Sequence, residues 1–342
     1  MPGRPEEDAK SRPLPWQRLA WVTWRQHRVA LLGVAIFLGA LALWLWRTGI
    51  GLHRAYAATA ACHPVGSAVC GVLRTAFNGT DSFVAGGYVL QAVPALIGAF
   101  VGAPVLGREL ETGTFRYAWT QGFGRRRWAL GKLVALAVSV TVAAGAMSVL
   151  LDWYYQPYFA ARNQSLDLTE ASPLAAGLFG VRGIAFAAWT LAAFAIGALA
   201  GLLIRRVVPA IAATLAAYAG LSVAAGLYLR LHYLTPLIIR NDFPPGSAWT
   251  ISRWWTKQGQ PVSQSVVDHV LQGAPASVAG KGGVPEAFAS VRYLSEHGYA
   301  QLISYEPASR FWPFQWIEGG WLLALSLVLI AATVWLVRRR AV

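Results

Sequence analysis

Residues that could carry out chemistry are few in this sequence. The nearest approach to a phosphate-binding loop is 124–133, GRRRWALGKL, which has six residues between its glycines where that motif has four. It also has Leu133 where the motif needs a Ser or Thr to bind magnesium. The six His residues lack the paired spacing of a zinc site, and no GxSxG hydrolase turn occurs. We therefore expect a chain that is not an enzyme and that holds no cofactor or metal of its own.

One polar loop, 107–128, combines acids with aromatic side chains: GRELETGTFRYAWTQGFGRRRW. Phe115 and Trp119 are four residues apart and would share a face of a short helix. Glu109 and Glu111 would lie near the start of that helix, where carboxylates offset the helix dipole. An apolar anchor beside ordered charges is typical of a surface that binds a partner protein. The alternative interpretation is an ordinary solvated turn.

Six apolar runs must position this loop. The chain is 56% hydrophobic and 13% charged, whereas soluble domains have about 25% charged residues. A bilayer core about 30 Å thick needs roughly 20 apolar residues in a helix, and continuous rather than alternating runs exclude a β-barrel. We expect an all-α integral membrane protein with six transmembrane helices, at 29–46, 83–106, 133–151, 184–204, 207–229 and 319–337.

The positive charge indicates the orientation of these helices. The net charge is +14, and most Lys and Arg residues lie on one side, in the segments 4–28, 108–132, 205–206 and 338–340. The positive-inside rule makes this side cytoplasmic. We therefore expect a multi-pass protein of the plasma membrane with both termini in the cytoplasm and basic side chains facing anionic lipid. No nucleic-acid partner is expected, because no basic cluster interleaves with aromatic residues on a soluble domain.

The segments outside the spans complete the predicted organisation. Residues 1–28 form a cytoplasmic tail and an interfacial amphipathic helix, because three Trp residues fall within nine positions beside two Arg residues one heptad apart. Residues 29–229 hold five spans and the polar loop. Residues 230–317, rich in Pro and Gly, form a small extracytoplasmic segment. Residues 318–342 form the last span and a basic cytoplasmic tail.

Local signals add detail to these regions. A helix is predicted from Pro285 to about Glu296, ended by Gly298. Pro94 predicts a kink in the second span. The GxxxG patterns at 98–102 and 197–201 predict close helix contact, with chance as the alternative in a chain so rich in Gly and Ala.

Two cysteines fall in the predicted outer loop after the first span. Cys62 and Cys70 would lie in an oxidising compartment, which favours a disulfide around Pro64 and Gly66. The alternative is two free thiols packed against the membrane surface.

Ionisable residues are nearly absent from the predicted spans. Asp152 and Glu318 are placed at span ends, and Arg182 lies either near the outer boundary or in a re-entrant helix. Ion-coupled transporters carry their coupling ion on buried carboxylates or histidines. Any uphill transport by this chain should therefore take its energy from a partner at the cytoplasmic side.

The polar loop carries a resemblance to a known family. Arg108-Glu109-x-Glu111-x-Gly113-Thr114 resembles the R-E-x-E-x-G-T motif of ABC-type exporter permeases, the ABC transporter family two. That family has six spans, an amphipathic elbow helix before the first and a coupling helix after the second. The turn at 205–210 and the YxPxxRFWxFQxxE ending at 305–318 resemble actinobacterial members. The resemblance covers essentially the whole chain.

The resemblance implies a function and its partners. It implies a permease dimer, formed with a second copy or a paralogue, docked on two ABC ATPase subunits that bind ATP and Mg. It assigns ATPase coupling to Arg108, Glu109, Glu111, Gly113, Thr114, Phe115 and Trp119. The apolar path suggests export of hydrophobic or amphipathic cargo. The alternatives are a membrane sensor or resistance protein that transports nothing, and a membrane-bound enzyme acting on lipid.

Overall fold

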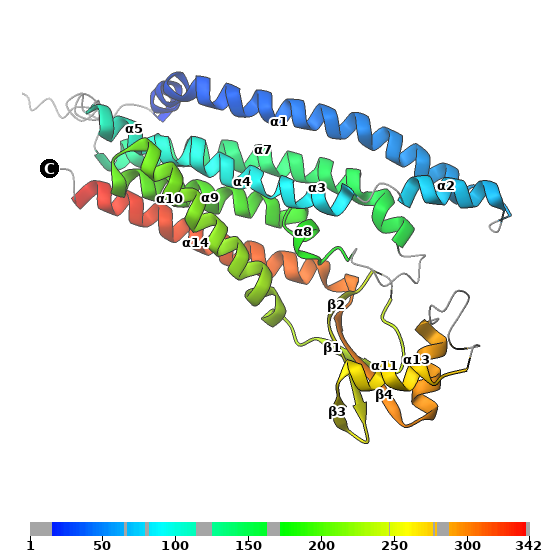
Figure 1. Cartoon of the computed structure of the whole chain (residues 1–342). Helices are drawn as coiled ribbons and strands as arrows, with labels where there is room; N and C mark the ends of the chain where they lie inside the picture. The colour runs from blue at the N-terminus through cyan, green and yellow to red at the C-terminus, as the bar shows by residue number, and fades with distance from the viewer. Residues whose placement is uncertain are drawn as a thin grey trace, which may run out of the picture.

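A bundle of long helices and a smaller sheet domain make up the protein, for which we use a computed structural model (Figure 1). The structure describes residues 16–64, 67–78, 82–113, 125–162, 172–245, 247–275, 278 and 287–339. α1 begins at the end of the bundle where α14 ends, and we call this the terminal end. The sheet domain lies at the opposite end, which we call the sheet end.

Six helical segments within these ranges are long and apolar enough to span a membrane, which confirms the six predicted spans. They are α1 (Trp16–Ala60); α3 (Ser82–Leu90), α4 (Ala92–Ile97), the π-helical turn η1 (Gly98–Gly102) and α5 (Ala103–Thr112) in series; α7 (Arg125–Arg162); α9 (Gly183–Ile204); α10 (Val207–Ala224) with η2 (Ala225–Leu229) and η3 (Arg230–His232); and α14 (Phe311–Arg339). Several extend beyond the apolar runs, because helix ends carry side chains that reach the interface.

The first span and the predicted interfacial helix form one continuous helix, α1. The side chains that precede Arg25 and the tail at 1–15 lie outside the described part, so the amphipathic elbow stays a prediction. Leu38, Leu45 and Leu52 are buried and recur every seven residues. A heptad of this kind forms the narrow seam by which one helix packs on another, and here the partner is α7.

The second span is interrupted, as Pro94 predicts. A turn at Gln91 separates α3 from α4, because the proline has no N–H to donate to the carbonyl four residues earlier. η1 follows, and its glycines face α9. A Cβ added at Gly98 would lie 2.5 Å from the carbonyl oxygen of Ala193, and one at Gly102 would lie 2.6 Å from that of Phe194.

The second GxxxG pattern provides the other side of this contact. Cβ atoms added at Gly197 and Gly201 would collide with the backbone of η1 and α5. The predicted close contact is therefore confirmed, and the two patterns meet each other. α9 is the central helix of the bundle, since it packs against α4, α5, α7, α10 and α14.

The sheet domain adds strands to the prediction for residues 230–317, which named one helix. It holds four antiparallel strands in the order β1-β4-β2-β3, where β1 is Leu237–Arg240, β2 Trp249–Lys257, β3 Gln260–Val262 and β4 Tyr299–Glu306. The protein is therefore all-α only in its membrane part. Two helices, α11 (Gln264–Gln272) and α13 (Ala287–Glu296), pack on the sheet around a core of Trp255, Val267, Val291, Leu294 and Tyr299.

The predicted helix of this domain corresponds to α13. It ends at Glu296, and Gly298 follows with φ 80°. Such a left-handed backbone after a helix favours glycine. The described helix begins at Ala287, and Pro285 lies outside the described residues.

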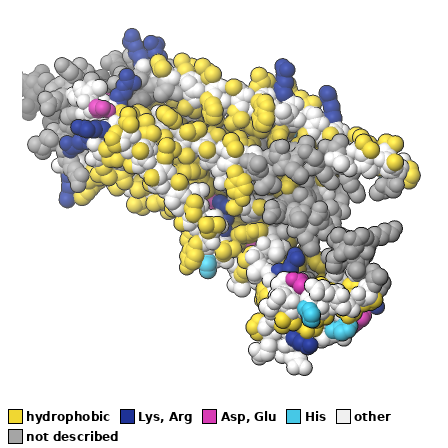
Figure 2. All heavy atoms as spheres, in the orientation of Figure 1, with side chains coloured by type: hydrophobic (Ala, Val, Ile, Leu, Met, Phe, Trp, Pro, Cys, Tyr) yellow, Lys and Arg dark blue, Asp and Glu magenta, His cyan; other side chains and the backbone are white. Residues whose placement is uncertain are grey.

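Exposed tryptophans mark the two ends of α14. Trp312 and Trp316 are exposed at the sheet end, and Trp335 is exposed at the terminal end, where Arg339 lies 4.3 Å from its ring centroid. The bundle surface between the ends is largely hydrophobic, and Lys and Arg gather at the terminal end (Figure 2). Aromatic residues of this kind are typical of membrane–water interfaces.

Candidate functional site

The R-E-x-E-x-G-T motif begins in the last two turns of α5, at the terminal end of the bundle. Arg108, Glu109 and Glu111 belong to this helix, and Gly113 ends it with φ 72°. We expected both carboxylates at the start of a coupling helix, but they lie at the end of the second span. Thr114, Phe115 and Trp119 fall outside the described residues, so their coupling role stays a prediction.

Carboxylates are disfavoured at this end of a helix, where the helix dipole is negative. The charges of Glu109 and Glu111 therefore need favourable contacts with neighbouring helices. Glu109 is compensated by Lys132 of α7, whose ammonium donates a hydrogen bond to Oε1. The Lys132 side chain is 2% exposed and that of Glu109 15% exposed. The Lys132 ammonium also lies 5.2 Å from the ring centroid of Trp128. Glu109 is therefore a buried link between α5 and α7 rather than a freely exposed charge.

Glu111 is compensated by the start of α10. Its Oε2 accepts the backbone N–H of Val207 at 3.0 Å. Val207 is the first residue of α10, and the preceding Arg206 makes no side-chain cap of its own. A first-turn N–H has no partner within its helix, so a carboxylate from α5 supplies the missing N-cap. The motif therefore fixes α5 to α7 through one acid and to α10 through the other.

The turn that leads into α10 has an unusual backbone. Arg205 ends α9 with φ 59°, a left-handed conformation that non-glycine residues rarely adopt. Arg205 and Arg206 are both exposed. Together with the end of α5, this turn places basic side chains beside the coupling motif.

A buried ion pair lies toward the sheet end, and the sequence analysis missed it. Glu318 of α14 is fully buried, and Arg230 of η3 is 5% exposed. Arg230 donates from Nε to Oε2 at 2.8 Å and from Nη2 to Oε1 at 2.7 Å. Trp189 Nε1 of α9 donates to Oε1 at 2.7 Å, and the Tyr233 hydroxyl donates to Oε2 at 3.1 Å.

The sequence analysis placed Glu318 at the end of a span and did not predict its burial. Glu318 lies in the third turn of α14, which begins at Phe311. The membrane part therefore does contain a buried carboxylate. All four of its hydrogen bonds come from protein donors.

The start of α9 is capped by neighbouring helices. Asp152 of α7 accepts a hydrogen bond from Arg182 Nε at 2.7 Å and one from the N–H of Gly183 at 3.3 Å. Gln315 of α14 accepts the N–H of Ala185 at 2.7 Å. Arg182 lies in the turn between the short helix α8 (Ala176–Phe179) and α9, and so within neither helix. These contacts join α7, α9 and α14 near the sheet end.

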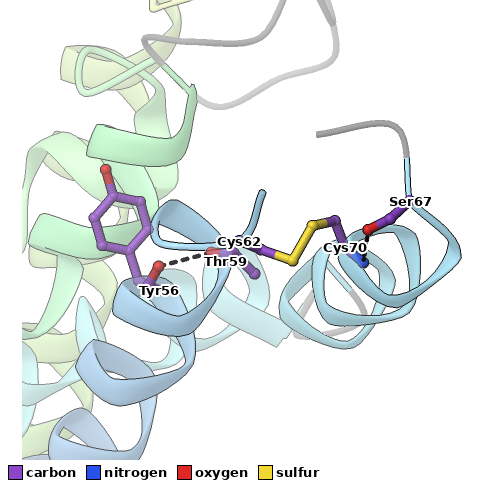
Figure 3. The surroundings of a disulfide bond; sticks show 5 residues. All are labelled: Tyr56, Thr59, Cys62, Ser67 and Cys70. Atoms are coloured by element: carbon purple, nitrogen blue, oxygen red, sulfur yellow. Dashed lines mark hydrogen bonds between the residues drawn. A yellow bond between two sulfur atoms is a disulfide. The ribbon is translucent and has the colours of Figure 1, made fainter. Parts of the chain in front are cut away.

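Cys62 and Cys70 form a disulfide at the sheet end of α1 (Figure 3). Their Cα atoms are 5.7 Å apart. The bridge ties the end of α1 to α2 (Ala68–Asn78), and the rings of Tyr56 and Phe77 pack beside it with centroids 5.9 Å apart. Its role is structural, because it clamps two helices together.

The charged contacts at both ends of the bundle join one helix to another. Within the described ranges, no three His, Cys, Asp or Glu side chains gather in a way that could hold a metal ion. Glu109 and Glu111 join the ends of neighbouring helices, and the Arg230–Glu318 pair joins η3 to α14. These are the contacts of a membrane protein whose helices must move or hold together as units.

Comparison with known proteins gives one match. Residues 35–230, more than half of the 342-residue chain, match the family described as ABC-2 membrane transporter related. No curated protein and no solved structure matches the sequence. The matched region holds the second, third and fourth spans, most of the first and fifth, both acids of the motif and Arg230. The chain therefore belongs to the ABC-2 membrane transporter related family and is a membrane permease subunit of an ABC transporter.

Proposed function

We propose that this permease exports hydrophobic or amphipathic cargo across the plasma membrane, driven by ABC ATPase subunits that dock at the terminal end. Both termini are then cytoplasmic, in agreement with the positive-inside rule. The energy enters through the segment that begins at Gly113. A second permease, identical or paralogous, completes the transport path.

The observation that carries this proposal is the attachment of the motif to two further helices. Glu109 connects α5 to α7, and Glu111 connects α5 to α10. A force applied to the segment after Gly113 therefore acts on three spans at once. A solvated turn without such contacts would move alone.

The surface and interior of the bundle support this choice of cargo class. Its exposed side chains are largely apolar (Figure 2). The buried carboxylate Glu318 is already saturated by Arg230, Trp189 and Tyr233, which leaves it no free lone pair for an ion. Apolar cargo that enters from lipid fits these conditions better than an ion or a sugar.

Reconstitution tests the proposal. The chain is co-expressed with candidate P-loop ATPases, purified, and incorporated into liposomes that contain a hydrophobic fluorescent probe. We expect a stable complex whose ATP hydrolysis drives the probe to the side opposite the ATPase. A chain that purifies alone while binding ligand through its sheet domain would contradict the proposal and support a sensor.

A further inference from the structure

The fifth span, which begins with α10, connects two regions. One is the R-E-x-E-x-G-T motif at 108–114, which we call the coupling motif, and the other is the point where the chain enters the sheet domain. The first residue of α10, Val207, donates its N–H to Glu111 at the terminal end. At the sheet end, Arg230 of η3 forms the buried pair with Glu318. The helical segment that begins at Val207 thus connects the two clusters of charge within one continuous stretch of chain.

Between its ends, this segment packs through a single stripe of side chains. Ala210, Thr214, Tyr218 and Ala225 are its buried residues before Arg230. Three of these side chains are small, and much of the remaining surface is exposed. An interface of this kind opposes movement along the helix axis less than interlocking large side chains do, since packed cores resist displacement.

The buried pair binds three helices at the point where the sheet domain joins them. Glu318 belongs to α14, Trp189 to α9, and Arg230 and Tyr233 to the end of the fifth span. Tyr233 in turn accepts a hydrogen bond from Trp321 Nε1 at 2.8 Å. The sheet domain begins four residues after Tyr233, at β1.

A second ion pair fixes the two connections of the sheet domain to each other. Arg310 donates from Nη1 to Glu306 Oε2 and to the carbonyl oxygen of Thr235, both at 2.7 Å. Thr235 precedes β1, and Glu306 is the last residue of β4 and is 1% exposed. The chain that enters the sheet domain and the chain that leaves it are therefore held together through Arg310.

We propose that α10 transmits displacement of the coupling motif to the sheet domain, with Arg230 and Glu318 as the positioning residues that make its outer end move together with α9 and α14. This rests on the proposed function, because the displacement comes from the ATPase. The π-helical turn η2, just before Arg230, is the point where the helix departs from regular geometry. Such turns occur frequently at functional sites.

The proposal assigns the sheet domain a role in the transport cycle. Its position changes with the nucleotide state, since it is attached to the helix that the coupling motif holds. The buried pair is required for this because an unpaired charge at that depth would separate the three helices or draw in water. The disulfide-linked α1 packs chiefly on α7 rather than on α10, so it serves as the reference for movement along α10.

Distance measurement on the ATPase complex tests the inference. Spin labels are placed on exposed positions of the sheet and of α1 by Ser252→Cys and Ala58→Cys, in nanodiscs, with unlabelled protomers in excess. We expect the distance distribution to shift between the nucleotide-free and the ATP–vanadate states. Glu318→Gln should abolish the shift and lower transport about tenfold, as coupling energies of this kind do, while ATP binding is retained.

A matched control replaces the same chemical group elsewhere. Glu296→Gln breaks an exposed ion pair with Arg292, whose side chains are 59% and 83% exposed, and should leave both the shift and transport unchanged. Should Glu318→Gln fail to assemble, Tyr233→Phe decides, since it removes the hydroxyl that donates to Glu318 and accepts from Trp321 and keeps the Arg230–Glu318 ion pair. It should reduce the shift in part and leave the amount of bound ATPase unchanged.

The outcomes separate this inference from the proposed function. If wild-type protein binds its ATPase and transports while the label distance stays constant, the inference is wrong and the exporter stands. A shift that survives in Glu318→Gln, or one that keeps its full wild-type size in Tyr233→Phe, also overturns it, whatever the loss of thermal stability. Failure to bind any ATPase would overturn the proposed function instead.

Discussion

Glu111 caps the first turn of α10 from a neighbouring helix, and Glu111→Ala measures what that cap contributes. The carboxylate accepts the Val207 N–H at 3.0 Å. Loss of an N-cap acceptor costs about 0.5–2 kcal/mol of the free energy of unfolding. Glu111 is exposed, so water can replace it at that N–H. We therefore expect a loss of about 1 kcal/mol, near the middle of that range.

The assay compares thermal unfolding of the purified variants in one detergent. A loss of about 1 kcal/mol should lower the melting temperature by roughly 2 °C in a protein of this size. Glu111→Gln keeps an oxygen acceptor and loses only the charge, which should cost about 0.5 kcal/mol through the helix dipole. Membrane insertion should be unchanged in both variants, whereas Glu111→Ala should export cargo more slowly per ATP hydrolysed.

The matched control is Glu296→Ala, which removes an exposed carboxylate from an i,i+4 pair with Arg292. Such a pair contributes about 0.3–0.5 kcal/mol. The cap explanation is refuted if Glu111→Ala destabilises the protein no more than Glu296→Ala does and export per ATP stays at the wild-type value. Glu111 would then have no role in linking α5 to α10 during transport.

Four further predictions follow from backbone, packing, covalent and topological features. Gly113→Leu should cost about 1–2 kcal/mol because φ is 72° there, and should uncouple ATP hydrolysis from transport while the chain still inserts. Gly197→Leu should lower the yield of folded protein sharply, measured by size-exclusion chromatography, because its Cβ meets the backbone of η1 and overpacking costs about 1–3 kcal/mol or more. Cys62→Ser should cost about 2–3 kcal/mol in the chain-entropy model of a short loop, seen as a lower melting temperature that reductant no longer changes. A membrane-impermeant maleimide added outside cells should label Ser252→Cys and not Arg206→Cys, and the reverse pattern would overturn the proposed orientation.

The membrane helices could be predicted from sequence because lipid leaves the backbone few options. Each apolar run had to be helical. α9 matches the run 184–204 to within one residue, and α10 together with η2 matches the run 207–229. The glycine patterns also identified a real contact, since small side chains are what allow two helix backbones to approach. The helix ended by Gly298 was predicted for an equally local reason.

The sheet was missed because its strands lack a clean alternation. A bulge between Thr250 and Ser252 changes the register of β2, so its polar and apolar residues do not repeat every two positions. The residues of β4 are buried or half-buried on both faces, which resembles a short apolar run.

The buried charges were missed for a different reason. Pro313 lies in the first turn of α14, a position where a helix tolerates proline, yet Pro and Gln315 interrupt the apolar run that precedes Glu318. Lys132 was counted among the loop charges, although α7 begins at Arg125. Pairing across helices depends on tertiary contacts, and one sequence without its neighbours in space does not show them.

The exposed tryptophans of α14 have a consequence for the surrounding lipid. Trp316 and Trp335 are about 28 Å apart along a helix that rises 1.5 Å per residue, close to the roughly 30 Å of a typical hydrocarbon core. Glu318 is two residues inward from the outer of these anchors, so the depth of the ion pair depends on how thick the bilayer is. Longer acyl chains would bury it further and shorter ones would bring headgroup water nearer to it. Activity measured across phosphatidylcholines of increasing chain length should therefore pass through a maximum.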